Sequence, residues 1–108
     1  MWVIKFLLLD LGHLNVASTI FEIDRNALLE EYLSEFGERV LEVHISENHG
    51  LKDEHLPVKS NSWQLDAIKK IKQIAIKNHG ERHYCVEAKN ASEAEIKESL
   101  FLINELVA

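Results

Sequence analysis

Three short apolar runs alternate along the chain with three longer segments of helical periodicity. The apolar runs cover residues 3–9, 40–46 and 83–88. In the second run, apolar and polar residues alternate one by one, which is the pattern of a strand with two different faces. Runs of this length are typical of strands, whereas helices are longer. The sequence therefore predicts three strands.

The three helical segments carry recognisable start and stop signals. The first is predicted between Asp24, a candidate N-cap, and Gly37, a candidate stop. The second is expected to begin after Ser62 and to end at Gly80, and the third opens at Ser92 with a capping-box pattern. Their apolar residues repeat at helical spacing: Leu28, Leu29, Tyr32, Leu33 and Phe36; Trp63, Ala67, Ile68, Ile71, Ile74 and Ala75; Ile96, Leu100, Ile103 and Val107.

The order strand, helix, strand, helix, strand, helix is typical of an α/β fold with a parallel sheet and right-handed crossovers. A chain of 108 residues provides for one hydrophobic core, so we expect a single domain over residues 1–108. Helices joined with one handedness to adjacent strands cover one sheet face and leave the other bare. Because the first run is apolar on both faces, we expect a homo-oligomer, most simply a two-fold dimer.

Charge and cysteine content restrict the partners and the compartment. The formal net charge of −6 disfavours binding to nucleic acid through its phosphates. The single cysteine, Cys85, suits a reducing compartment and is interpreted as a small core residue. The apolar run near the start is interrupted by Lys5, stopped by Asp10 and too short to span a membrane. We therefore expect a cytoplasmic protein with no membrane partner.

Histidines and carboxylates lie at or just after the end of each predicted strand. Parallel α/β folds build their sites at these strand ends and in the loops that follow them. These residues are Asp10 and His13 after the first strand, His44 near the end of the second, Asp53 and His55 in the loop after it, and Glu87 near the end of the third. Each alone can be a turn former or a solvated loop residue. Their coincidence at one sheet edge favours a site for manganese, zinc or iron.

Three segments resemble the xylose-isomerase-like barrels, a superfamily that includes sugar phosphate isomerases, epimerases and endonuclease IV. Residues 44–57, with the sequence HISENHGLKDEHLP, resemble the seventh strand and the following loop of these barrels. Residues 9–13 resemble the sixth strand with its Asp-x-x-His, and residues 86–89 the eighth strand with its glutamate. The resemblance implies three parallel strand–helix units equivalent to the last three βα units of a (β/α)8 TIM barrel.

The resemblance also implies roles for individual residues. Asp10, His44 and Glu87 would bind a divalent cation, manganese or zinc, and Glu87 would also shuttle a proton. His13 would contact substrate, as would Lys52, which stands where an arginine is common. In the endonuclease IV branch, which holds three zinc ions, the ligand set would grow by three residues: His13, Asp53 and His55.

The implied function is a metal-dependent isomerase or epimerase of carbohydrate metabolism, acting on a small sugar or sugar phosphate. The family's glutamate at the end of the fifth strand, which binds metal and shuttles a proton, has no counterpart here. We therefore expect the site to be incomplete in the isolated chain and to need a second copy or a companion chain. Two alternatives remain: a non-catalytic, metal-binding or oligomer-forming half-barrel, and a fragment of a DNA-repair endonuclease.

Overall fold

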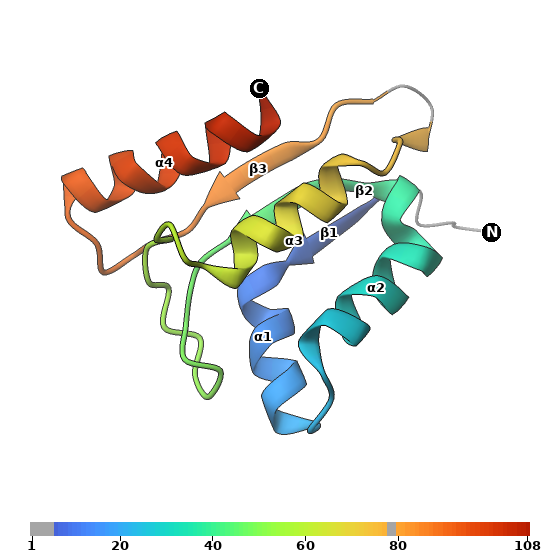
Figure 1. Cartoon of the computed structure of the whole chain (residues 1–108), viewed down its shortest axis with the longest axis horizontal. Helices are drawn as coiled ribbons and strands as arrows, with labels where there is room; N and C mark the ends of the chain where they lie inside the picture. Colours follow the sequence, from blue (N-terminus) through green and yellow to red (C-terminus); the bar gives the residue numbers. More distant parts are fainter. Residues whose placement is uncertain (1–5, 78–79) are drawn as a thin grey trace.

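A three-stranded parallel sheet lies at the centre of the computed structural model, which describes residues 6–77 and 80–108 (Figure 1). Its strands are β1 (Leu7–Asp10), β2 (Val40–Ile45) and β3 (His83–Val86), in the order β1-β2-β3. The α/β prediction is thus confirmed. The first strand is shorter than predicted, because Phe6 lies outside it and residues 3–5 lie outside the described part. The third ends two residues early, at Val86.

Four α-helices occupy the described residues: α1 (Leu11–Ile20), α2 (Arg25–Phe36), α3 (Trp63–Lys72) and α4 (Glu93–Val107), with a 3-10 turn, η1 (Gly37–Arg39), after α2. The predicted N-caps are confirmed, since Asp24, Ser62 and Ser92 each accept a backbone N–H of the first turn. Helix α3, however, ends at Lys72 and not at Gly80. The guanidinium of Arg82 binds the carbonyls of Ile71 and Ile74 and so closes the helix early.

Helix α1 was not predicted. It follows β1 without a loop, because Asp10 is both the last residue of the strand and the N-cap, its Oδ1 accepting the His13 N–H at 2.9 Å. His13 therefore lies in the first helical turn and not in a loop. The stripe that α1 buries mixes apolar and polar residues: Leu11, Gly12, Leu14, Asn15 and Ser18. Such a stripe gives little hydrophobic periodicity, and this hid the helix in the sequence.

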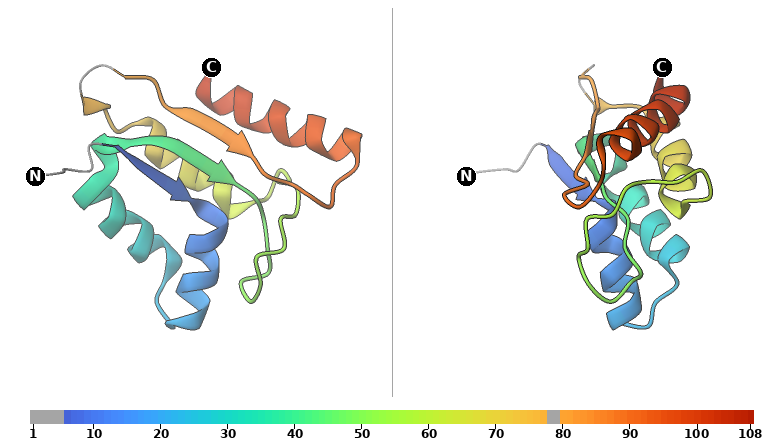
Figure 2. Two further views of the ribbon diagram at one scale, coloured as in Figure 1. Left: turned by 180° about the vertical axis from the view of Figure 1, so that it is seen from behind. Right: turned by 90° about the vertical axis from the view of Figure 1, so that its left-hand side faces the viewer.

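The helices cover one face of the sheet. Viewed from behind, all three strands lie in front of the helices, and no described helix covers them (Figure 2). Leu9, Val43 and Ile45 point to the covered face, where they join the buried core with residues of α2 and α3 such as Leu29 and Ile68. The predicted arrangement, with one face covered and one bare, is thus confirmed for the described residues.

The uncovered face carries a mixture of apolar and polar side chains. In β2 it presents Glu42 and His44, and the register places Leu8 beside Glu42 and Cys85 beside His44. Leu8 is 46% exposed, and Cys85 is exposed too. The prediction that Cys85 is a core residue was therefore wrong, because the alternation of β3 places it on the uncovered face.

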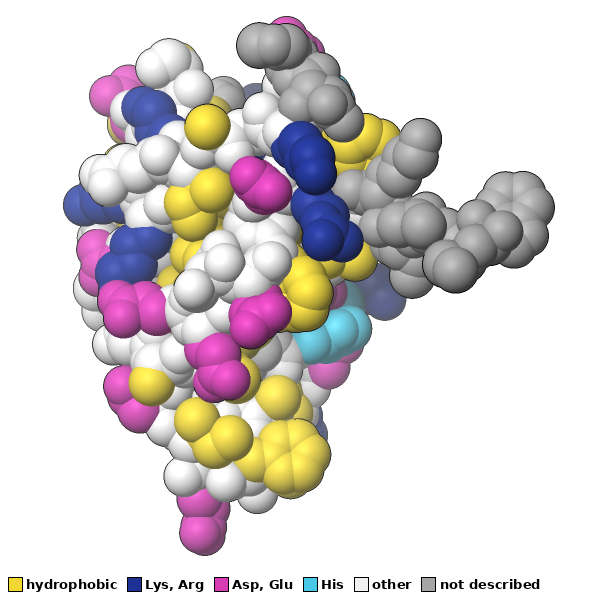
Figure 3. Space-filling model, turned by 90° about the vertical axis from the view of Figure 1, so that its right-hand side faces the viewer, with side chains coloured by type: hydrophobic (Ala, Val, Ile, Leu, Met, Phe, Trp, Pro, Cys, Tyr) yellow, Lys and Arg dark blue, Asp and Glu magenta, His cyan; other side chains and the backbone are white. Residues whose placement is uncertain are grey.

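A second group of exposed apolar side chains lies at the turn between α1 and α2, the lower end of the molecule in Figure 3. Its members are Ile20, Phe21 and Ile23. None of the helices in the described part is both long and apolar enough to span a membrane.

Candidate metal centre

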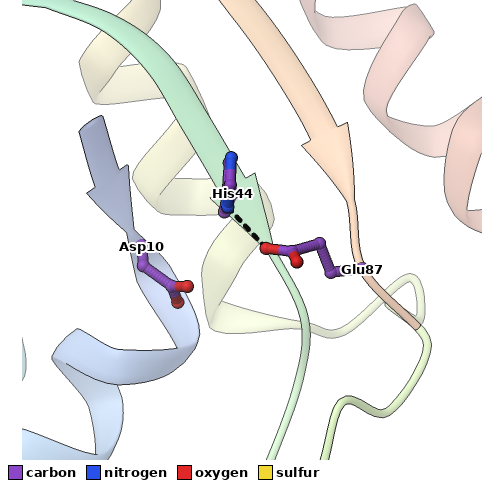
Figure 4. A group of neighbouring side chains, drawn as sticks. All are labelled: Asp10, His44 and Glu87. Atoms are coloured by element: carbon purple, nitrogen blue, oxygen red, sulfur yellow. Dashed lines mark ion pairs between the residues drawn. The ribbon is translucent and has the colours of Figure 1, made fainter. Parts of the chain in front are cut away.

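The three residues expected to bind metal converge where the strands end. Asp10 is the last residue of β1, His44 lies in β2 opposite Asp10 in the register, and Glu87 directly follows β3. Each offers one ligand atom, and these atoms all lie within 4.8 Å of one another. Figure 4 shows the three side chains pointing into a common space. The sheet holds Glu87 there, because the backbone N–H of Glu87 donates to the Ile45 carbonyl at 2.9 Å and so continues the hydrogen bonding between β2 and β3.

The imidazole of His44 lies between two carboxylates. Its Nδ1 is 2.5 Å from Oε1 of Glu87 and its Nε2 is 2.7 Å from Oε1 of Glu42. The hydrogen bond with Glu42 is the main cause that raises the pKa of His44, and the charge of Glu87 raises it further, against the opposing effect of burial. This surplus of negative charge around His44 favours a positive charge in the centre, either a proton or a bound cation.

The other three predicted residues form an adjacent cluster. Oδ2 of Asp53 lies 3.0 Å from Nε2 of His13 and 3.0 Å from Nε2 of His55. The bond between Asp53 and His13 raises the pKa of the His13 imidazole and lowers that of the Asp53 carboxyl. Nδ1 of His13 is also 3.5 Å from Oδ2 of Asp10, so this cluster adjoins the first. The structure thus brings together all six histidines and carboxylates predicted from the strand ends.

His55 connects the long loop after β2 to the end of β3. Its Nδ1 donates to the backbone oxygen of Glu87 at 2.9 Å, and its own backbone oxygen accepts the Lys89 N–H at 3.1 Å. Its φ of 54° places it in the left-handed region, which is costly for a residue with a Cβ. The contacts with the segment after β3 hold this unfavourable conformation, so the position of His55 is fixed by tertiary structure.

The base of the same loop is fastened to α1 by a buried asparagine. Nδ2 of Asn48 donates to the Gly12 carbonyl at 3.0 Å, while its Oδ1 accepts Nδ2 of Asn15 at 2.8 Å and the Gly50 N–H at 2.8 Å. Gly50 has a φ of 88°, and a Cβ there would lie 2.6 Å from Oγ1 of Thr19. The loop therefore approaches α1 as closely as a glycine allows, and this places Asp53 next to His13.

Sequence reasoning missed the roles of Glu42 and Asn48. For Glu42 a signal existed, because it alternates with His44 on one strand face. For Asn48 there was none, since only the buried position of its side chain, 7% exposed, reveals that it holds the loop.

Two loop residues remain outside both clusters. Lys52, the expected substrate contact, is exposed, and its ammonium group forms no ion pair with any described residue. His49 binds Oε1 of Glu54 through its Nδ1 at 2.9 Å and is largely exposed. A substrate role for Lys52 thus stays a prediction.

The donor set fits a divalent cation. One imidazole and two carboxylates, presented at the ends of three adjacent strands, are ligands that both zinc and manganese accept. Three protein ligands leave coordination positions open for water or a substrate, as in catalytic sites. The cluster of His13, Asp53 and His55 borders this open side. No family model, curated protein or solved structure matches the chain.

Proposed function

We propose that this chain binds one divalent cation, zinc or manganese, through Asp10, His44 and Glu87. The observation that carries the proposal is the convergence of these three ligand atoms within 4.8 Å, from the ends of three different strands. We further propose that the centre serves a metal-dependent isomerase or epimerase acting on a small sugar or sugar phosphate. The sequence resemblance of the three strand ends to xylose-isomerase-like barrels supports that choice of chemistry.

In such a reaction each residue has a distinct task. A bound divalent cation supplies Lewis acidity, which polarises a substrate carbonyl or hydroxyl and acidifies the neighbouring C–H. Glu87 would accept the proton. His13, whose side chain is 62% exposed beside the centre, would contact the substrate. One carboxylate cannot both remove a proton from one face of a carbon and return it to the other.

We propose that the barrel is completed by further strand–helix units, supplied by a second copy or by a companion chain. The support is physical: parallel sheets are normally covered on both faces, yet no described helix covers the face with Leu8. In addition, β1 and β3 each pair along one edge only among the described residues. The lone Cys85 agrees with the expected cytoplasmic location.

A DNA-repair endonuclease is the second candidate. The observation in its favour is the His13–Asp53–His55 cluster, whose imidazoles and carboxylate are the donor types of a zinc site. The net charge of −6 opposes it, because phosphate binding needs positive charge. A non-catalytic, metal-binding half-barrel is the remaining alternative.

Titration of metal-free protein with Zn²⁺ or Mn²⁺, followed by calorimetry, tests the metal centre. We expect His44→Ala to weaken binding by at least about tenfold, because the only nitrogen ligand of the centre is lost. His49→Ala is the matched control, since His49 is a largely exposed histidine outside both clusters. Unchanged affinity in His44→Ala would disprove the metal centre.

Activity assays separate the candidate functions. The isolated chain should show little epimerase activity towards a panel of sugars and sugar phosphates, because it offers one shuttling carboxylate. Robust turnover that Glu87→Gln abolishes would show that this chain is sufficient. Cleavage of a duplex that contains an abasic site, dependent on added zinc, would support the endonuclease instead. Cation binding without either activity would support the non-catalytic alternative.

A further inference from the structure

Glu42 lies two residues before His44 on the same, uncovered face of β2. Its Oε1 is 2.7 Å from Nε2 of His44, on the side of the imidazole ring away from Glu87. The side chain of Glu42 is 51% exposed and that of His44 is 20% exposed. None of the ion pairs among the described residues joins Glu42 to a lysine or arginine, so His44 is its ionisable partner in this part of the chain.

The contact with Glu42 affects which ring nitrogen of His44 can bind a metal. A neutral imidazole carries a hydrogen on one nitrogen and a lone pair on the other, and only the nitrogen with the lone pair can bind a metal. An ionised carboxylate only accepts hydrogen bonds, and one faces each ring nitrogen of His44: Glu42 at Nε2 and Glu87 at Nδ1. With Nδ1 and Glu87 both turned to a cation, the ring hydrogen would be on Nε2, where Glu42 accepts it.

We propose that Glu42 is a positioning residue of the metal centre: by accepting the Nε2 hydrogen of His44, it fixes the tautomer and the ring orientation that present Nδ1 to the cation. This inference rests on the proposed metal centre and adds to it a residue that does not itself bind the ion. A carboxylate behind a metal-binding histidine makes the nitrogen a stronger donor, and its loss typically lowers metal affinity about tenfold to hundredfold.

The neighbours of Glu42 support this role. The register places Leu8 on one side of Glu42 and His83 on the other. Glu42 and His44 both lie in β2, which pairs with β1 and with β3 and holds the two residues at a fixed separation more firmly than a loop would. A hydrogen bond in a less polar environment is stronger, so covering this sheet face would strengthen the hold on His44.

The test is titration of the full chain, freed of metal, with Zn²⁺ alone. We expect Glu42→Ala to bind Zn²⁺ about tenfold to hundredfold more weakly than the wild type. Glu42→Gln should lie between the two, because its amide oxygen still accepts the Nε2 hydrogen but carries no charge. Glu30→Ala is the matched control. Glu30 lies in α2, outside the centre, and also forms one side-chain contact, with Lys70 at 3.1 Å. It should bind as the wild type does.

A second measurement distinguishes positioning from a general loss of structure. The ¹⁵N chemical shifts of the His44 ring, measured in metal-free protein at a pH where the ring is neutral, should show a population with hydrogen on Nε2 in the wild type and in Glu42→Gln. In Glu42→Ala this population should be lost in favour of hydrogen on Nδ1, because Glu87 is then the remaining carboxylate beside the ring. Wild-type affinity and wild-type ring shifts in Glu42→Ala, with binding lost in His44→Ala, would overturn the role of Glu42 alone. Wild-type affinity in both variants would overturn the metal centre and this inference together.

Discussion

Nδ1 of His55 lies 2.9 Å from the backbone oxygen of Glu87, which joins the loop after β2 to the residue that directly follows β3. The two residues are 32 positions apart in the sequence. The contact fixes the loop that carries Asp53 beside the backbone at the end of β3. Because the carbonyl oxygen only accepts hydrogen bonds, Nδ1 of His55 must carry the hydrogen.

The backbone of His55 provides a direct test of this arrangement. With a φ of 54°, any residue other than glycine pays a steric cost of about 1–2 kcal/mol there. Both His55→Ala and His55→Gly lose the ring and should unfold more easily than the wild type. We expect His55→Ala to be the less stable of the two by about 1 kcal/mol, because glycine adopts this conformation freely. Urea unfolding measures the difference, and equal stabilities would refute the left-handed conformation.

Arg82 should be a main determinant of stability. Its guanidinium donates to the carbonyls of Val40 at 2.7 Å, Ile71 at 2.8 Å, Gly37 at 3.1 Å and Ile74 at 3.2 Å. Lysine cannot reach these four acceptors with one ammonium group, so Arg82→Lys should lose about 1–3 kcal/mol of unfolding free energy despite its retained charge.

The matched control for Arg82 is Arg39→Lys, because the side chain of Arg39 makes no hydrogen bond to a described residue. Its unfolding free energy should change by less than about 0.5 kcal/mol. Thermal or urea unfolding of the two variants gives the comparison. Equal losses of unfolding free energy in both variants would mean that the hydrogen bonds from Arg82 to the four carbonyls do not stabilise the fold.

The contact between His13 and Asp53 predicts a pH window of stability in metal-free protein. His13, whose pKa is raised from 6.5, contributes fully below that value and loses its contribution as the pH rises through its folded-state pKa. Asp53, whose pKa is lowered from 3.8, contributes above that value and loses its contribution as the pH falls through its folded-state pKa. The difference in stability between the wild type and His13→Gln should therefore be largest between about pH 4 and 6.5. Thermal unfolding with a chelator across pH measures this, and a pH-independent difference would contradict it.

Association through the uncovered sheet face should depend on Leu8. We expect the wild type to sediment as an oligomer at micromolar concentration and Leu8→Lys to shift it towards the monomer, because a charge would be buried in the interface. Leu51→Lys is the control, since Leu51 is 75% exposed but lies in the loop after β2. A well-dispersed wild-type monomer would refute association through this face.

The sequence by itself determined the parallel α/β arrangement and the members of the candidate centre. Strand and helix periods differ, so 40–46 and 83–88 were recognisable as strands, and Asp24, Ser62 and Ser92 marked helix starts because capping depends on the local chain. Parallel strands bring their carboxyl ends to one edge whatever the details of packing. For that reason Asp10, His44 and Glu87 could be expected to meet before any distance was known.

Only the tertiary structure decided which side chains are buried, which are exposed and which of them meet. Helix α1 buries a mixed stripe that includes Asn15, and the amide of Asn15 finds its partner only where the loop from Asn48 packs against the helix. Cys85 is exposed because no described helix lies over its sheet face. The contact of Glu42 with His44 and the left-handed backbone of His55 likewise arise from neighbours in space. Local sequence patterns report local preferences, whereas burial and side-chain contacts are set by residues that are distant in the chain.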